Sequence, residues 1–173
     1  MKRVYPAVFV LSILFSACKD QQVQQSSGAD SLRTIEILDP EAEKIFSKEA
    51  PLDVLGSGFV WSEGPLWLKD QQKLVFSDAP HNVIYSWTEK DSIQVYLKPS
   101  GYTGKAAREG EVGSNGLTLS PEGTLILCQH GNRAVAEMQA PLDAPLPDFK
   151  ILAGMFEGKK LSSPNDIFCD RKG

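Results

Sequence analysis

The sequence predicts an all-β protein built as a β-propeller, and three observations lead to this prediction. Short runs rich in β-branched and aromatic residues follow one another from residue 59 onward, separated by Gly, Pro, Asp and Asn. This pattern is typical of strands joined by tight turns. A polar motif recurs about every 50 residues, and each of the two full copies holds four such runs. A four-stranded unit that repeats every ~40 to 50 residues is the sequence pattern of a propeller blade.

The repeat is anchored on Glu63, Asn115 and Asn165. A Ser-Glu-Gly triplet returns as Ser-Asn-Gly at an offset of 52 residues, from 63 to 115, and Ser-Pro-Asn-Asp follows 50 residues later, from 115 to 165. The first offset continues downstream, because Asp78 and His130 end the next apolar run of their copies. The alternative is an open β-sandwich in which the spacing is a coincidence.

The four strands expected in the first copy cover residues 64–68, 73–78, 82–88 and 92–98. In the second copy the Pro-rich stretch 140–147 separates the last two strands, and we expect it to be a surface loop. The partial propeller, residues 59–173, thus holds about two blades and the start of a third. Because propellers protect their strand edges by radial closure, we expect the natural reading frame to continue for three or more further blades.

Residues 1–18 have the organisation of a bacterial lipoprotein signal peptide. Two basic residues precede the apolar run 4–15, and Phe-Ser-Ala-Cys follows. The run is shorter than the ~18 apolar residues of a membrane-spanning helix, so an anchor helix is the weaker interpretation. Phe15 is too bulky for an ordinary cleavage site, and we expect lipid on Cys18; the alternative is plain secretion with a free cysteine. The protein is then exported and held in the periplasm or outer membrane by its lipid alone.

The segment between the signal and the strands has two parts. Residues 19–31 contain one apolar side chain larger than Ala, so they are expected to form a disordered tether. Residues 32–58 form a lead-in in which Asp39, Pro40 and Glu41 indicate the start of a short helix. We expect the apolar side of this helix to pack on the chain that follows.

Polar residues at equivalent positions of the repeat are expected to meet on the propeller axis. The first strand of each blade lines the central channel, which places Glu63, Asn115 and Asn165 together. Carboxylate and amide oxygens are donors that Ca²⁺ accepts in sets of ~6 to 8, and an unpaired charge in such a tunnel would be costly. The equally weighted alternative is that these side chains only turn the chain or bind backbone amides.

Five segments, taken in order, resemble the gluconolactonase, senescence marker protein and regucalcin family. They are Phe-Val-Trp-Ser-Glu-Gly-Pro-Leu-Trp at 59–67, Leu-Val-Phe-Ser-Asp at 74–78, Ser-Asn-Gly-Leu-Thr at 114–118, Cys-Gln-His-Gly-Asn-Arg at 128–133 and Ser-Pro-Asn-Asp at 163–166. The resemblance implies a six-bladed propeller with a divalent ion on its axis, Ca²⁺ first and Zn²⁺, Mg²⁺ or Mn²⁺ as other choices. It also implies hydrolysis of a small-molecule sugar lactone or related ester, with the ion polarising the carbonyl.

The resemblance also assigns roles to residues. Glu63 and Asn165 would be metal ligands, and Asn115 either a ligand or a hydrogen-bond partner of the substrate. Family members add a later Asp as metal ligand and general base. That position lies beyond Gly173, so residues 1–173 alone are expected to be inactive.

Two further positions are expected at the edge of the pocket. His130 and Asp78 end the second strands of their copies, and we expect them to contact substrate as hydrogen-bonded rim residues rather than as catalytic groups. The Arg that senescence marker protein has two residues before its second Asn is Gly113 here, so its substrate contacts are not carried over. The alternative function is a non-catalytic propeller lipoprotein that uses Ca²⁺ to organise a sugar- or protein-binding face.

Composition and motifs exclude several other classes. The net charge is −4 and the basic residues are scattered, which argues against nucleic-acid binding. The chain has no Gly-x-Ser-x-Gly elbow, Walker loop or His-Glu-x-x-His motif, and two His cannot form a typical zinc hydrolase site alone. Cys128 and Cys169 each lie in an apolar run, so we expect buried thiols, with a disulfide as the alternative.

Overall fold

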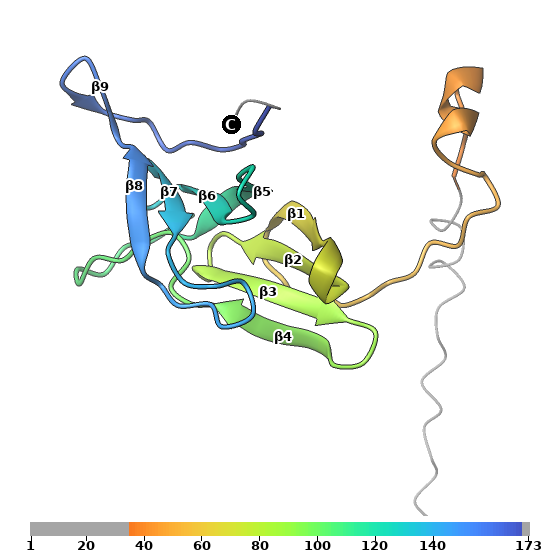
Figure 1. Ribbon diagram of the computed structural model, residues 1–173, viewed down its shortest axis with the longest axis horizontal. Coiled ribbons are helices and arrows are strands. Elements are labelled where there is room, and N and C mark those ends of the chain that lie inside the picture. The colour runs from red at the N-terminus through yellow and green to blue at the C-terminus, as the bar shows by residue number, and fades with distance from the viewer. Residues whose placement is uncertain (1–34, 171–173) are drawn as a thin grey trace, which may run out of the picture. The chain divides into compact units, whose positions relative to one another are not determined.

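The computed structural model describes residues 35–170 (Figure 1), and its contacts divide the chain into one unit that ends at Asp53 and another that starts at Val54. The first contains the 3₁₀ helix η2 (Pro40–Lys44), and Asp39 caps it by accepting a hydrogen bond from the Glu41 backbone N–H at 2.8 Å. The cap confirms the predicted helix start. The predicted packing of this helix stays a prediction, and the predicted signal and tether lie outside the described residues.

The second unit contains two four-stranded antiparallel sheets and a small hairpin. The first sheet has the strand order β1 (Ser62–Leu68), β2 (Lys73–Asp78), β3 (Val83–Thr88), β4 (Ser92–Leu97), with the 3₁₀ turn η3 (Lys69–Gln71) after β1. The second has the order β5 (Ser114–Leu119), β6 (Leu125–Gln129), β7 (Ala134–Met138), β8 (Phe149–Ala153). The hairpin is β9 (Met155–Phe156) with β10 (Lys159–Lys160).

Each sheet is a meander in which consecutive strands are neighbours, as a propeller blade requires. The four strands predicted for the first copy are all present, and the Pro-rich stretch 140–147 forms the loop between β7 and β8. Among the described residues no helix is long and apolar enough to cross a membrane. The all-β prediction is therefore confirmed.

The hydrophobic core runs from one sheet into the other. Its nine buried members are Leu68, Val75, Ile84, Tyr96, Leu97, Leu117, Leu125, Leu127 and Met138. They come from both meanders. Alternate residues of a strand face the same side of its sheet, and one side of each sheet faces this shared core. Full burial of one aliphatic side chain contributes about 1.5–3 kcal/mol, so the two blades stabilise each other.

The two inner strands, β1 and β5, lie side by side, and two glycines allow the close approach. Gly64 has φ +52°, and a Cβ placed there would lie 2.3 Å from the Asn115 carbonyl oxygen. At Gly116 a Cβ would lie 2.8 Å from the Asp166 Cα, and the Gly116 N–H donates to the Asn165 carbonyl at 2.8 Å. The third copy therefore meets β5 at the position where β5 meets β1.

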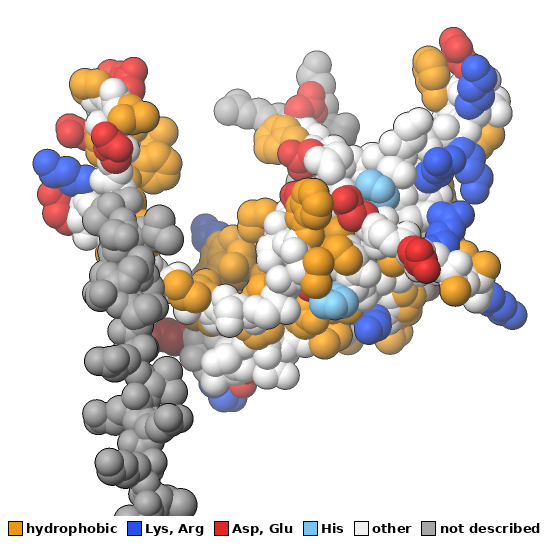
Figure 2. All heavy atoms as spheres, turned by 180° about the vertical axis from the view of Figure 1, so that it is seen from behind, with side chains coloured by type: hydrophobic (Ala, Val, Ile, Leu, Met, Phe, Trp, Pro, Cys, Tyr) orange, Lys and Arg blue, Asp and Glu red, His pale blue; other side chains and the backbone are white. Residues whose placement is uncertain are grey.

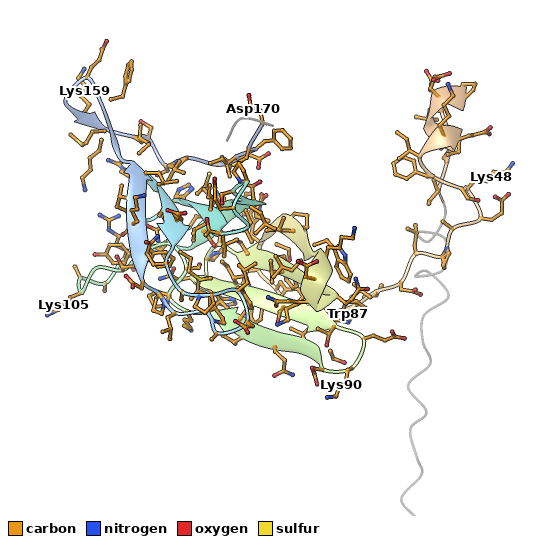
Figure 3. The ribbon with its side chains drawn as sticks, viewed as in Figure 1. Lys48, Trp87, Lys90, Lys105, Lys159 and Asp170 are labelled. Atoms are coloured by element: carbon orange, nitrogen blue, oxygen red, sulfur yellow. The ribbon has the colours of Figure 1, made fainter. Side chains whose placement is uncertain are left out.

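The hairpin of β9 and β10 projects from the second blade (Figure 1), and the chain then returns past β5. Met155 and Phe156 are 58% and 69% exposed in this hairpin. Lys159 lies at its tip (Figure 3), and Figure 2 shows basic side chains gathered on this side of the unit. The hairpin is thus a solvent-facing connection that leads from the second blade to the third copy.

Candidate active site

The predicted site residues lie at one edge of the two blades. In antiparallel neighbours the start of one strand faces the end of the next, and here Ser62 pairs with Asp78 and Ser114 with Gln129. The edge therefore holds the first residues of β1 and β5 together with the last residues of β2 and β6. This placement follows from the strand order alone and agrees with the equal spacing of the repeat.

Both inner strands bulge at the repeated motif. The pairing of β1 with β2 shifts register between Glu63 and Leu66, and that of β5 with β6 shifts between Ser114 and Leu117. A bulge leaves residues unpaired in the ladder and re-aims their side chains. The same irregularity thus occurs in both copies at the polar residue and the Gly of the motif.

Asn115 is the centre of the site, and only 1% of its surface is exposed. Its Nδ2 donates to Asn165 Oδ1 at 2.9 Å and lies 3.1 Å from His130 Nδ1. Its Oδ1 is buried and has no hydrogen-bond partner among the described residues. The amide nitrogen is thus fully engaged, while the carbonyl oxygen keeps its lone pairs available.

Glu63 lies on the neighbouring strand and is half-buried. Its Oε1 accepts a hydrogen bond from Trp61 Nε1 at 2.8 Å. Opposite it in β2, the Ser77 hydroxyl donates to the backbone carbonyl of Asn115 at 2.9 Å, which connects the first blade to β5. The structure therefore brings Asn115 and Asn165 into contact, whereas no hydrogen bond between described residues joins Glu63 to either Asn.

His130 follows β6, with 28% of its side chain exposed. Its Nδ1 lies 3.8 Å from Glu111 Oε2 in addition to its contact with Asn115. His130 thus contacts the buried Asn115 amide and is itself partly exposed to solvent. Substrate contact by His130 stays a prediction.

Asp78 is buried, and its carboxylate binds groups of the protein. It accepts hydrogen bonds from the backbone N–H groups of Val60 and Trp61 at 3.3 and 3.2 Å, and its Oδ2 lies 2.7 Å from His81 Nδ1. These contacts fix the chain that enters β1, which carries Glu63. The arrangement favours a structural role, and substrate contact by Asp78 stays a prediction.

Two residues near the site, His81 and Glu111, were not predicted from the sequence. His81 is half exposed and comes three residues after Asp78, in the turn between β2 and β3. The Asp-x-x-His spacing after a strand could have indicated it, because a short acidic side chain at a strand end binds groups in the following turn. Glu111 lies in the irregular segment before β5 and carries no signal in the repeat.

Cys128 lies in β6 and is completely buried, and both described cysteines are free. Burial, and then the negative charge of Asp166, raise the pKa of the Cys128 thiol to about 11. The expected buried thiol is present at Cys128, whereas Cys169 is partly exposed. A thiol with this pKa is protonated at neutral pH and is a poor nucleophile.

The amide oxygens of the site are donors of the kind expected for the predicted cation. In the described part of the chain no three His, Cys, Asp or Glu residues cluster to hold a metal ion. The buried, unpartnered Asn115 Oδ1 is nevertheless a hard oxygen donor, and such donors are suited to Ca²⁺. Asn165 and Glu63 would complete the part of the set that this chain supplies.

Two four-stranded meanders joined at their inner strands, with a third copy on the second, define a β-propeller. A family model described as SMP-30/Gluconolactonase/LRE-like region matches residues 61–173. The chain belongs to this family, and the predicted fold class and family are both confirmed.

Known proteins support the same assignment. The chain is 30% identical over 155 residues to the gluconolactonase of Zymomonas mobilis. The aligned region covers 88% of this chain and 42% of that protein. Among solved structures, a gluconolactonase of Xanthomonas campestris described as important in glucose secondary metabolic pathways is 28% identical, with a TM-score of 0.62 over 82% of this chain and 41% of that one. A structural-genomics target described as a candidate gluconolactonase is 29% identical, with a TM-score of 0.62 over 82% and 42%. The chain thus spans less than half the length of these relatives.

Proposed function

We propose that the whole protein hydrolyses a sugar lactone or related ester, using a divalent cation, Ca²⁺ first, held in part by Glu63, Asn115 and Asn165. Family membership supports the reaction class. The observation that supports the cation site is the Asn115 Oδ1, which is buried and has no hydrogen-bond partner within residues 35–170. It lies next to Asn165, the residue predicted to share the ion, at the edge where β1 and β5 begin.

An unpartnered buried oxygen needs a physical reason. Leaving a buried acceptor unsatisfied costs about 1–3 kcal/mol, and a purely structural Asn would relieve this cost by turning its oxygen to a donor. Here the Asn115 nitrogen is already committed to two acceptors, at 2.9 and 3.1 Å. A ligand with positive charge, or a donor group of a substrate, satisfies the oxygen without moving the amide.

A bound divalent cation would supply Lewis acidity that polarises the lactone carbonyl. The chain's own residues provide the frame. Asn115 and Asn165 hold neutral oxygens in place, and Glu63 adds one negative charge that Trp61 Nε1 orients at 2.8 Å. Ser77 fixes the Asn115 backbone to the first blade at 2.9 Å. These contacts arrange the donors before any ligand arrives, which is the basis of electrostatic preorganisation.

The test uses the protein expressed from its full natural reading frame. We expect it to hydrolyse glucono-δ-lactone, to lose activity with a chelator and to regain it with added Ca²⁺. The Glu63→Gln variant should lower Ca²⁺ affinity by about tenfold or more, because the ligand charge sets affinity in such sites, and turnover should fall with it. Glu43→Gln, at an exposed position of η2, is the matched control and should change neither.

Two results would contradict this proposal. Unchanged Ca²⁺ binding in E63Q would remove Glu63 from the site. Absence of hydrolysis across a panel of sugar lactones and aryl esters would favour the non-catalytic sugar- or protein-binding propeller.

Export and lipid attachment at Cys18 form part of the proposal and are supported by the pattern of residues 1–18. In bacteria supplied with labelled palmitate, the wild-type protein should take up label and remain with the membrane fraction. Cys18→Ser should take up none, and label in that variant would contradict the assignment.

A further inference from the structure

His130 and Asn165 present hydrogen-bond acceptors to the same amide group, and this pairing has a use in the proposed site. We propose that His130 is a positioning residue: its Nδ1, together with Asn165 Oδ1, fixes the Asn115 carboxamide so that Oδ1 faces the cation or substrate. This inference rests on the proposed function and deepens it. It concerns the orientation of one side chain, which can be observed in the protein without any ligand.

The two ends of an Asn carboxamide are almost equal in size, so packing alone does not decide which end faces a ligand. Hydrogen bonds decide it, because the nitrogen only donates and the oxygen only accepts. At Asn115 both neighbours are acceptors: Asn165 Oδ1 at 2.9 Å and His130 Nδ1 at 3.1 Å. A flipped amide would place its oxygen against the Asn165 oxygen and leave a buried NH₂ group without an acceptor.

The contact also assigns the proton on the His130 ring. Since the Asn115 nitrogen cannot accept, Nδ1 must be the unprotonated nitrogen and Nε2 must carry the hydrogen. Glu111 Oε2 also faces Nδ1 but lies farther away, at 3.8 Å. Within the described part of the chain, the Asn115 amide is therefore the one close partner of the His130 Nδ1.

The backbone holds the ring in this place. β6 ends at Gln129, the His130 N–H donates to the Cys128 carbonyl at 3.0 Å, and the His130 carbonyl accepts from the Arg133 N–H at 3.1 Å. Cys128 and Gln129 are completely buried. A ring that follows a buried strand and is closed into a turn can determine the orientation of its neighbour, in the way that residues behind metal ligands orient those ligands.

The experiment compares two variants of similar shape in the protein from the full reading frame. His130→Asn keeps an acceptor close to the Nδ1 position, and His130→Leu removes it with little change in size. Titration calorimetry with Ca²⁺ should show an affinity about tenfold to a hundredfold weaker for H130L, the range found when partners of metal ligands are removed. H130N should stay within about threefold of the wild type. Equal affinity of H130L and wild type would overturn the proposal.

A second measurement needs no ligand and separates the two proposals. The ¹⁵N resonances of the His130 ring in the cation-free wild type should show Nε2 protonated and Nδ1 accepting; the opposite tautomer would overturn the inference whether or not Ca²⁺ binds. The expected tautomer in a protein that binds no Ca²⁺ would support the amide orientation and refute the cation site. If H130L fails to fold, the ring resonances and H130N decide, and a tenfold loss of affinity in H130N would count against His130 as a positioning residue.

Discussion

Replacing Gly64 by Ala should weaken the joint between the first two blades. Gly64 has φ +52°, where a side chain costs about 1–2 kcal/mol. The new Cβ would also lie 2.3 Å from the Asn115 carbonyl oxygen and 2.9 Å from the Gly116 Cα. Both are backbone atoms, so β5 must move, and overpacking of this kind costs a further ~1–3 kcal/mol. The expected loss in the free energy of unfolding is about 2–5 kcal/mol.

A second glycine separates the two contributions. Gly123 has φ +84°, and no atom of the described residues lies within 4 Å of the position that a Cβ would occupy, so Gly123→Ala has the conformational cost alone. Urea unfolding of the protein from the full reading frame should show G123A about 1–2 kcal/mol less stable than wild type, and G64A less stable still. Equal losses in the two variants would refute the close approach of β1 and β5. A smaller loss in G64A than in G123A would do so as well.

The remaining predictions concern alkaline pH and the thiols. Burial raises the pKa of Cys128 from its usual 9.0 to about 11 and that of Tyr96 from 10.0 to about 12. The folded state therefore keeps protons that the unfolded state releases. The protonated Cys128 and Tyr96 side chains give their full contribution to the free energy of unfolding below pH 9. This contribution, about 3 kcal/mol for each group, is lost as the pH rises through 11 and 12. Urea midpoints should fall between pH 9 and 11, and a flat profile would contradict the buried states. At pH 8 a thiol reagent should modify the partly exposed Cys169 and leave Cys128 intact until the protein unfolds; equal rates would contradict its burial.

The fold was predictable because its strands and turns have recognisable patterns in the local sequence. β-branched and aromatic runs with Gly, Pro and Asn between them gave the strands of the first blade within two residues at each end. The offsets from Glu63 to Asn115 and Asn165 predicted a radial array, and the structure places the two Asn side chains in contact at 2.9 Å. Equal spacing thus identified which residues share an edge.

Other parts of the site depend on information that the spacing lacks. The hydrogen bond from Trp61 Nε1 to Glu63 depends on the side-chain rotamers of two residues on β1 and just before it. The carboxylate of Asp78 forms hydrogen bonds with two backbone N–H groups and with His81. Predicting these bonds requires the path of the chain that enters β1. The position of a residue in the repeat predicts where its Cα lies in the fold. The hydrogen-bond partners of its side chain then determine which further groups that side chain can bind.

The glycines of the motif connect blade packing with the donor geometry. Each glycine follows a polar residue at a register shift, and at each one the backbone of the next copy comes close. The backbone of Asn115 lies against Gly64, and that of Asn165 and Asp166 lies against Gly116. The contact that brings two blades together therefore also sets the distance between successive polar residues. A larger residue at either glycine should separate the blades and move the donors apart in one step. For this reason stability and cation affinity should fall together in G64A, whereas G123A should lower stability alone.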